Sequence, residues 1–148
     1  MRYFEPVKGA TDVKLPTRST IGNAGYDFYA PQEIHVPAHG SSDFVWTNVK
    51  AFMESNVVLL LFPRSSLGLK GLQLAYTVGV VDSDYYGNQD NDGNIGVKFI
   101  NWSDEDITLA AGERIFQGVF TKYWTTSDDR IVSHYLNYHY HFHMKLRK

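Results

Sequence analysis

Short apolar runs separated by turn residues dominate the hydrophobic pattern of this chain. Residues 44–49 alternate between apolar and polar side chains, as a strand does when one of its faces is buried. Val57–Phe62 is apolar throughout, which favours a strand covered on both faces. Ile95–Ile100 and Ile115–Phe120 are further expected strands. The pattern therefore predicts a protein built mainly from short strands.

Turn signals separate these runs, and no segment has a long helical period. A single helical turn is expected at Ser65–Leu69. Short strands at close spacing favour a sandwich, jelly roll or barrel, and an aromatic content of 15% agrees with β structure. The chain has 148 residues and no internal repeat or linker, so we predict one all-β domain. The turn signals are glycine-containing clusters at 23–25, 37–40, 68–71, 92–93 and 111–112.

Composition and charge exclude several classes of function. Lys and Arg total 14 against 16 Asp and Glu, and a net charge of −2 gives no general attraction to nucleic acid. The absence of cysteine excludes disulfides and thiolate metal sites. The longest aliphatic run, Val57–Phe62, is too short to cross a membrane, and the N-terminus lacks the apolar stretch of a signal peptide. A soluble, cytoplasmic protein is therefore expected.

A candidate phosphate-binding segment, Pro63–Gly68, follows directly on the apolar run. Arg64 offers a planar fork for phosphate oxygens, and the hydroxyls of Ser65 and Ser66 can donate hydrogen bonds. Backbone N–H groups at the start of a helical turn would attract an anion as well. The alternative is a surface turn in which a serine caps the helix.

Two acidic positions are candidates for catalysis or metal binding. Asp82 follows an apolar run and precedes a glycine turn, a setting that can raise the pKa of a carboxyl and direct it at a water molecule. Asp27 lies between aromatic residues on an expected strand, where it either faces water or serves as an oxygen ligand for Mg²⁺. In Gly112–Gln117, Gln117 could reach a phosphate, whereas Glu113 and Arg114 could form a turn salt bridge.

Four segments in this order resemble motifs one to four of the trimeric dUTPase family. The resemblance spans about residues 13–127 and is closest to the dUTPases of Gram-positive bacteria and their phages. The Lys122–Thr126 segment is similar to theirs too. The four motif segments are Ala24–Asp27, Pro63–Ser66, Gly79–Tyr85 and Gly112–Gln117.

This resemblance implies a fold, a reaction and a set of roles. The fold would be a β jelly roll of the β-clip type that forms a homotrimer, with active sites at the subunit interfaces. The reaction would be hydrolysis of dUTP to dUMP and pyrophosphate, in which Asp82 activates a water molecule for attack on the α-phosphate. Asp27 would hold Mg²⁺ through water. The phosphates would contact Arg64, Ser65, Ser66 and Gln117, with Gly68 in the same segment.

The resemblance also implies how the nucleoside is recognised. Tyr85 would pack under the deoxyribose and exclude a 2′-hydroxyl by its bulk. Tyr76 stands where many relatives carry an Asn that contacts the nucleotide, so base recognition would rest on the backbone alone or Tyr76 would stack on the ligand. The backbone groups expected to read uracil belong to Gly79, Val80, Val81 and Gly96.

Two segments depart from the family pattern. The loop Asn88–Gly93 lengthens motif three, and we predict a solvent-exposed hairpin tip there, the alternative being an element that binds a partner or shields the substrate. Residues 1–133 are expected to form the dUTPase domain, and 134–148 form an atypical tail in place of the family's glycine-rich arm. The tail is expected to be idle; a substitute arm is the alternative, and its alternating His139, His141 and His143 could bind a transition metal.

Two other functions stay open at this point. A dUTPase-fold protein of low activity could act as a regulator by binding a phage or bacterial repressor, and the missing glycine-rich arm favours this alternative. An enzyme similar to dCTP deaminase would share the fold, but the Asp82–Tyr85 sequence favours dUTP hydrolysis.

Overall fold

The fold is almost entirely β, with one short α-helix and one 3₁₀ turn in the described part. The structure is a computed structural model and describes residues 1–132. The elements are β1 (Tyr3–Pro6), β2 (Tyr26–Tyr29), β3 (Ile34–Val36), β4 (Val45–Trp46), β5 (Val49–Phe52), β6 (Val57–Pro63), α1 (Ser65–Leu69), β7 (Leu72–Leu74), β8 (Gly79–Val81), η1 (Ser83–Tyr85), β9 (Gly96–Val97), β10 (Phe99–Asn101), β11 (Ile107–Leu109) and β12 (Arg114–Lys122).

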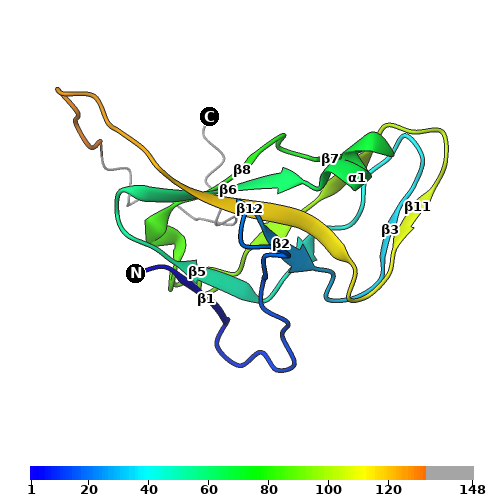
Figure 1. Cartoon of the computed structure of the whole chain (residues 1–148), viewed down its shortest axis with the longest axis horizontal. Coiled ribbons are helices and arrows are strands. Elements are labelled where there is room, and N and C mark those ends of the chain that lie inside the picture. The colour runs from blue at the N-terminus through cyan, green and yellow to red at the C-terminus, as the bar shows by residue number, and fades with distance from the viewer. Residues whose placement is uncertain (133–148) are drawn as a thin grey trace.

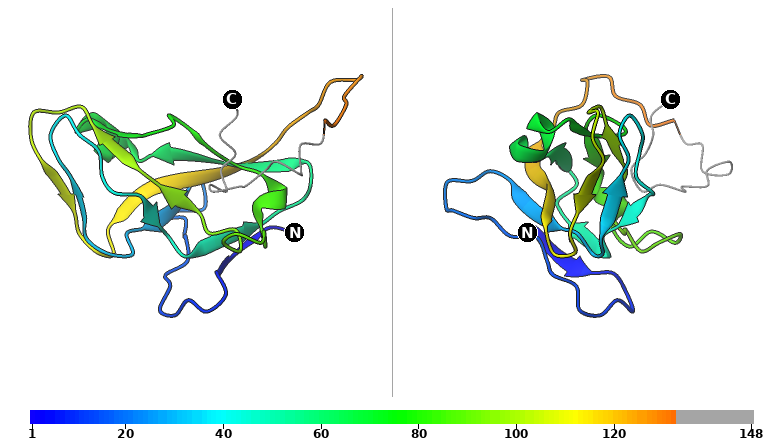
Figure 2. Two further views of the ribbon diagram at one scale, coloured as in Figure 1. Left: turned by 180° about the vertical axis from the view of Figure 1, so that it is seen from behind. Right: turned by 90° about the vertical axis from the view of Figure 1, so that its right-hand side faces the viewer.

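Strand β12 runs through the middle of the molecule and organises its largest sheet (Figure 1). That sheet has four antiparallel strands in the order β2-β12-β6-β8. Four two-stranded antiparallel sheets surround it, formed by β1 with β5, β3 with β11, β4 with β9 and β7 with β10. Figure 2 shows the β3–β11 pair at the opposite end of the molecule from β1. The all-β prediction is confirmed.

Stacked aromatic rings form the centre of the core between β2 and β12. Phe28 and Phe116 stack with ring centroids 4.4 Å apart, and Phe4 of β1 packs edge-on against Phe28 at 5.5 Å. Such pairs contribute beyond the area they bury, so they fix how β2 lies on β12. Other fully buried side chains come from β3, β6, β7, β8 and β10–β12, among them Val36, Leu59, Leu61, Leu74, Val81, Phe99, Leu109 and Ile115.

The apolar runs at β6 and β12 are strands as predicted, whereas two other runs are divided. Residues 44–49 contribute β4, which pairs with β9, and the start of β5, which pairs with β1. Asn48, with φ of 62°, lies at the change of partner. Ile95–Ile100 is split in the same way between β9 and β10. The chain crosses from one sheet to another at these corners, and alternation of residue types does not reveal a change of partner.

The predicted helical turn is present as α1, directly after β6. Its N-cap residue is Arg64, in an extended conformation and without a side-chain capping hydrogen bond. Ser65 is therefore the first helical residue and not the cap, so its hydroxyl is not committed to closing the helix end.

The loop Asn88–Gly93 is not a hairpin tip, and this prediction was wrong. The flanking strands β8 and β9 pair with β6 and β4, not with each other. Only Gln89 and Asp90 of the loop are exposed. Asparagine side chains and a partly exposed ion pair draw the loop onto the body of the protein, because these groups find partners within the chain.

The chain leaves the body after β12. Residues 123–132 project and then turn back, and Trp124 on this segment is 87% exposed (Figures 1 and 2). The predicted tail at 134–148, including the alternating histidines, lies outside the described residues. Within residues 1–132, no helix is long and apolar enough to span a membrane.

Candidate active site

The register of β12 brings three of the four motif segments to one place. Gln117 of β12 lies opposite Asp27 of β2 on one side and opposite Phe62 of β6 on the other. Arg64 follows β6 immediately, at the start of α1. Because paired residues lie side by side across a sheet, Asp27, Arg64 and Gln117 meet although they are far apart in sequence.

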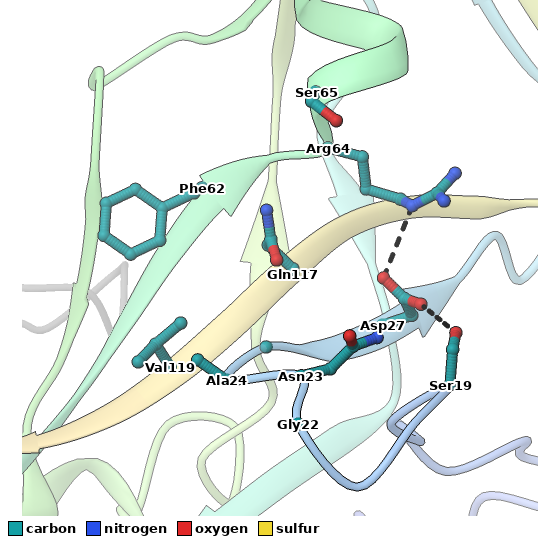
Figure 3. A pocket seen from close by; sticks show the side chains of 11 residues that line it. Ser19, Gly22, Asn23, Ala24, Asp27, Phe62, Arg64, Ser65, Gln117 and Val119 are labelled. Atoms are coloured by element: carbon teal, nitrogen blue, oxygen red, sulfur yellow. Dashed lines mark hydrogen bonds and ion pairs between the residues drawn. The ribbon is translucent and has the colours of Figure 1, made fainter.

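These residues line an open cavity of about 410 Å³ (Figure 3). Ser65 contributes from the first turn of α1, while Phe62 and Val119 form an apolar wall. Gly25 makes room for the Gln117 side chain, since a Cβ at position 25 would lie 2.2 Å from Gln117 Oε1. The cavity is thus largely polar, with hydrogen-bond donors from three elements.

An ionic cluster centred on Asp27 forms one side of the cavity. Asp27 is buried, and its Oδ1 lies 3.3 Å from Arg64 Nε while its Oδ2 lies 3.6 Å from Arg114 Nη1. Ser19 Oγ donates to Oδ2 of Asp27 at 3.4 Å, and Arg114 Nη1 donates to Ser19 Oγ at 3.2 Å. Two guanidinium groups share one carboxylate, so the cluster has an excess positive charge that favours an anion.

Arg114 is a site residue that the sequence interpretation missed, because it was assigned to a turn salt bridge with Glu113. A register irregularity between Arg114 and Phe116 in the β2–β12 pairing shifts the alternation of side chains. Arg114 therefore reaches the same carboxylate that lies opposite Gln117. The order of residue types in Gly112–Gln117 contains no signal for such a bulge.

The loop before β2 supplies the remaining wall of the cavity and was missed as well. Ser19, Gly22 and Asn23 line it. Arg18 holds this loop in shape, since its Nη1 donates to the carbonyl oxygens of Ile21 at 2.8 Å and Asn23 at 3.0 Å. The positions of these residues depend on the conformation of the loop, which the amino-acid composition does not predict.

Asp27 is the one carboxylate among the described residues that line the cavity, so a metal ion there would be held mainly by water and by ligand oxygens and not by a protein cage. Within residues 1–132, no group of three or more His, Asp or Glu side chains is placed to hold a metal. Asp27 offers hard oxygens beside the cationic donors, and its ion pairs at 3.3 and 3.6 Å are longer than close charge-assisted hydrogen bonds. Mg²⁺ usually takes one or two carboxylates and keeps several waters.

The predicted base and nucleoside-reading residues gather elsewhere, at β8 and its flanks. Asp82 follows β8, the edge strand next to β6, and its Oδ2 is withdrawn from solvent. Val81 pairs with Leu59, near the other end of β6 from Arg64. At about 3.3 Å per residue, the path from Leu59 to Arg64 is on the order of 16 Å. Asp82 therefore lies far from Arg64 within one chain, and it is not among the residues that line the cavity.

Tyr76 closes the turn that leads into β8. Its hydroxyl donates to the carbonyl oxygen of Gly96 at 3.1 Å, and burial raises the pKa of this hydroxyl above its ordinary value, so it remains a donor. Thr77 has φ of 68°, and Val78 N donates to Tyr76 O at 2.8 Å in a three-residue turn of a rare, strained type. A Cβ at Gly96 would lie 2.3 Å from the Phe44 ring, so packing also requires this glycine.

Tyr85 is buried beside Asp82 in the 3₁₀ turn η1. Its hydroxyl donates to the carbonyl oxygen of Asn94 and accepts a hydrogen bond from Asn91 Nδ2 at 3.1 Å. The hydroxyl end of the phenol is thus fixed in place by two hydrogen bonds. Of the other predicted contacts, Ser66 Oγ lies 3.5 Å from Arg64 Nη1, while Gly68 lies on α1 away from the lining of the cavity.

Comparisons with known proteins agree on one family. The family model described as dUTPase matches residues 11–137. A deoxyuridine 5′-triphosphate nucleotidohydrolase from Lactococcus lactis is 39% identical over 118 residues, which are 79% of this chain and 78% of that protein. The corresponding protein of vaccinia virus is 33% identical over 127 residues, 86% of this chain and 80% of its own.

Solved structures agree in fold. A dUTPase from Streptococcus mutans is 42% identical, has a TM-score of 0.76 and matches 83% of this chain and 97% of its own. A Staphylococcus bacteriophage dUTPase has a TM-score of 0.71 at 19% identity, over 90% of this chain and 89% of its own. At that identity the phage structure supports the fold alone.

Replacing Arg64 by Lys tests whether the cavity binds phosphate groups. Arg64→Lys keeps the charge but removes the planar fork, so affinity for inorganic pyrophosphate should fall about tenfold. Titration calorimetry in buffer without divalent metal measures this directly. The matched control is Arg130→Lys at an exposed position outside the cavity. Equal affinity of the wild type and Arg64→Lys would show that the cavity is not the anion site.

Proposed function

Because the chain belongs to the dUTPase family, we propose that it hydrolyses dUTP to dUMP and pyrophosphate. The observation that carries this proposal is the cavity in which Asp27, Arg64 and Gln117 meet with an excess of positive charge. It offers donors for several phosphate oxygens at once. A triphosphate is the ligand that such a group of donors suits.

The reaction consumes one water molecule at the α-phosphorus. The carboxylate of Asp82 takes a proton from the water, and the water oxygen forms a bond to the α-phosphorus. The bond from that phosphorus to the bridging oxygen breaks, and pyrophosphate leaves with its electron pair. Arg64, Ser65, Ser66 and Gln117 donate to phosphate oxygens, where charge builds up, so catalysis rests on positioning and electrostatics.

We propose a site shared between chains, because Asp82 lies far from Arg64 within one chain and does not line the cavity. In a homotrimer, the cavity of one chain would receive Asp82 and the segment around β8 from a neighbouring chain. The heterologous interfaces of a closed ring place unlike surfaces of two subunits together in this way. The open form of the cavity and the edge position of β8 support this arrangement.

A divalent cation completes the charge balance of the reaction. The family works with such a cation, and Mg²⁺ is proposed because hard oxygen donors are present. Asp27 would hold it through water, together with phosphate oxygens of the substrate. When bound, the cation neutralises part of the triphosphate charge.

Recognition of the nucleoside is assigned to the segment around β8. Backbone groups of Gly79, Val80 and Val81 lie on an edge strand, whose outer side is available to a base. The Gly96 carbonyl accepts a hydrogen bond from the Tyr76 hydroxyl, so Tyr76 would fix the position of the Gly96 backbone in the base site. Tyr85 would exclude a 2′-hydroxyl by its bulk, because its ring is held rigidly.

The remaining proposals concern location, partners and the tail. The cytoplasm is proposed as the site of action, since nucleoside triphosphates are used there. A repressor partner stays a prediction, because the phage structures match at 19% identity and support the fold alone. Residues 1–133 are proposed as the catalytic domain, with 134–148 idle.

Asp82→Asn provides the direct test of the reaction. Loss of the base should lower the rate of pyrophosphate release from dUTP by about 10²–10⁴-fold while pyrophosphate affinity stays unchanged. Purified wild type and variant are compared with dUTP and with dCTP. A wild type no faster than Asp82→Asn would refute the enzyme assignment, and ammonia release from dCTP would favour a deaminase.

Ending the chain after Ser133 tests the role of the tail. Since 134–148 lack the glycines with which an arm bends around phosphates, the shortened chain should turn over dUTP as fast as the full chain. Steady-state kinetics on both proteins provide the comparison. Slower turnover by the shortened chain would instead identify the tail as a substitute arm.

A further inference from the structure

The loop Asn88–Asn94 is folded by its own asparagine side chains. Asn88 Oδ1 accepts hydrogen bonds from the backbone nitrogens of Asp90 at 2.9 Å and Asn91 at 3.1 Å. Asn91 Oδ1 accepts from Asn88 Nδ2 at 2.9 Å and from Gly93 N at 3.1 Å. Local side-chain bonds of this kind replace regular secondary structure, so the loop has one defined shape.

This loop contacts Tyr85 at both ends of the residue. Asn88 Nδ2 donates to the backbone carbonyl of Tyr85 at 2.7 Å, and Asn91 Nδ2 donates to its hydroxyl at 3.1 Å. The hydroxyl in turn donates to the carbonyl of Asn94. The orientation of the Tyr85 ring therefore depends on where the loop lies.

The loop is attached to the rest of the protein through Asp92. Its Oδ2 lies 2.8 Å from Nζ of Lys50 on β5 and accepts a hydrogen bond from the backbone nitrogen of Lys8 at 2.8 Å. The hydrogen bond from Lys50 is the main cause that lowers the pKa of Asp92, so the carboxylate is ionised at neutral pH. The Lys50 side chain is only 12% exposed and lies 4.8 Å from the centre of the Tyr86 ring.

Removing Asp92 leaves the Lys50 ammonium without its closest carboxylate, and removing Lys50 leaves Asp92 with the backbone nitrogen of Lys8. Glu5 Oε1 lies 3.7 Å from Lys50 Nζ and would offset only part of the charge. A poorly solvated ammonium group without its carboxylate is unfavourable, so the segment around Asp92 would move away from β5. Because Asn88 and Asn91 donate hydrogen bonds to Tyr85, this movement would also displace Tyr85.

We propose that Lys50 and Asp92 are positioning residues that hold Tyr85 in place for discrimination between deoxyribose and ribose. This inference rests on the proposed function, in which Tyr85 excludes the 2′-hydroxyl. Neither residue lines the cavity. The pair acts through the loop, and the lengthened motif three is the element that makes this connection.

Two matched substitutions in the same loop test the proposal. Asp92→Asn removes the ion pair, whereas Asp90→Asn makes the same change two positions away at an exposed carboxylate. The ratio of kcat/KM for dUTP to that for UTP should fall about tenfold in Asp92→Asn and in Lys50→Met, and stay at the wild-type value in Asp90→Asn. Lys50→Arg keeps the charge and should keep most of the ratio.

Hydrogen exchange and pyrophosphate binding separate positioning from a general loss of stability. Backbone amides of 88–95 should exchange faster in Asp92→Asn but not in Asp90→Asn, and pyrophosphate affinity should be the same in all variants. A lower Tm with an unchanged dUTP-to-UTP ratio in both Asp92→Asn and Lys50→Met would overturn the proposal. A wild type that does not hydrolyse dUTP would instead overturn the proposed function on which it rests.

Discussion

The pairing of β12 with two strands at once is the constraint on which the cavity depends. Gln117 can lie opposite both Asp27 and Phe62 only while β2 and β6 keep their registers on either side of β12. A slip by one residue on either side would turn a whole strand over and remove its motif residue from the cavity. The stacked rings of Phe28 and Phe116 oppose such a slip, because they bury the other face of the same strands.

Charge balance inside the cavity follows from this arrangement. Burial of the Asp27 carboxylate is unfavourable unless a cation lies nearby, and Arg64 and Arg114 both supply one. In return, the Asp27 carboxylate holds the guanidinium groups of Arg64 and Arg114 close together when no phosphate is bound. In the proposed reaction, phosphate oxygens would take over these donors when substrate binds. The same carboxylate would then both organise the donors and offer oxygen atoms to a hydrated cation.

The sequence predicted the elements with strong local signals and missed those that depend on distant contacts. Val57–Phe62 and Ile115–Phe120 read as strands because each is a continuous apolar run, and the motif segments on them carry Arg64 and Gln117. Asp82 belongs to the same family pattern, but its distance from the cavity depends on how β8 pairs with β6. Patterns along one chain contain no information about this pairing.

Two further features show why the remaining details required a structure. Arg114 reaches Asp27 because of a bulge in β12, whereas neighbouring charges in sequence favour a pair with Glu113. The loop Asn88–Gly93 has the composition of an exposed tip, and asparagine suits either water or a network of internal hydrogen bonds. Lys50 lies on another strand, β5, and its ion pair with Asp92 holds the loop against the body of the protein.

We propose that the cavity and the base of each active site come from different copies of the chain. Two inactive variants, Arg64→Ala and Asp82→Asn, test it most directly when they are unfolded together in equal amounts and refolded. If each site takes Arg64 from one chain and Asp82 from its neighbour, random mixing should restore about a quarter of wild-type dUTP hydrolysis. A mixture no more active than either variant refolded alone would contradict the claim.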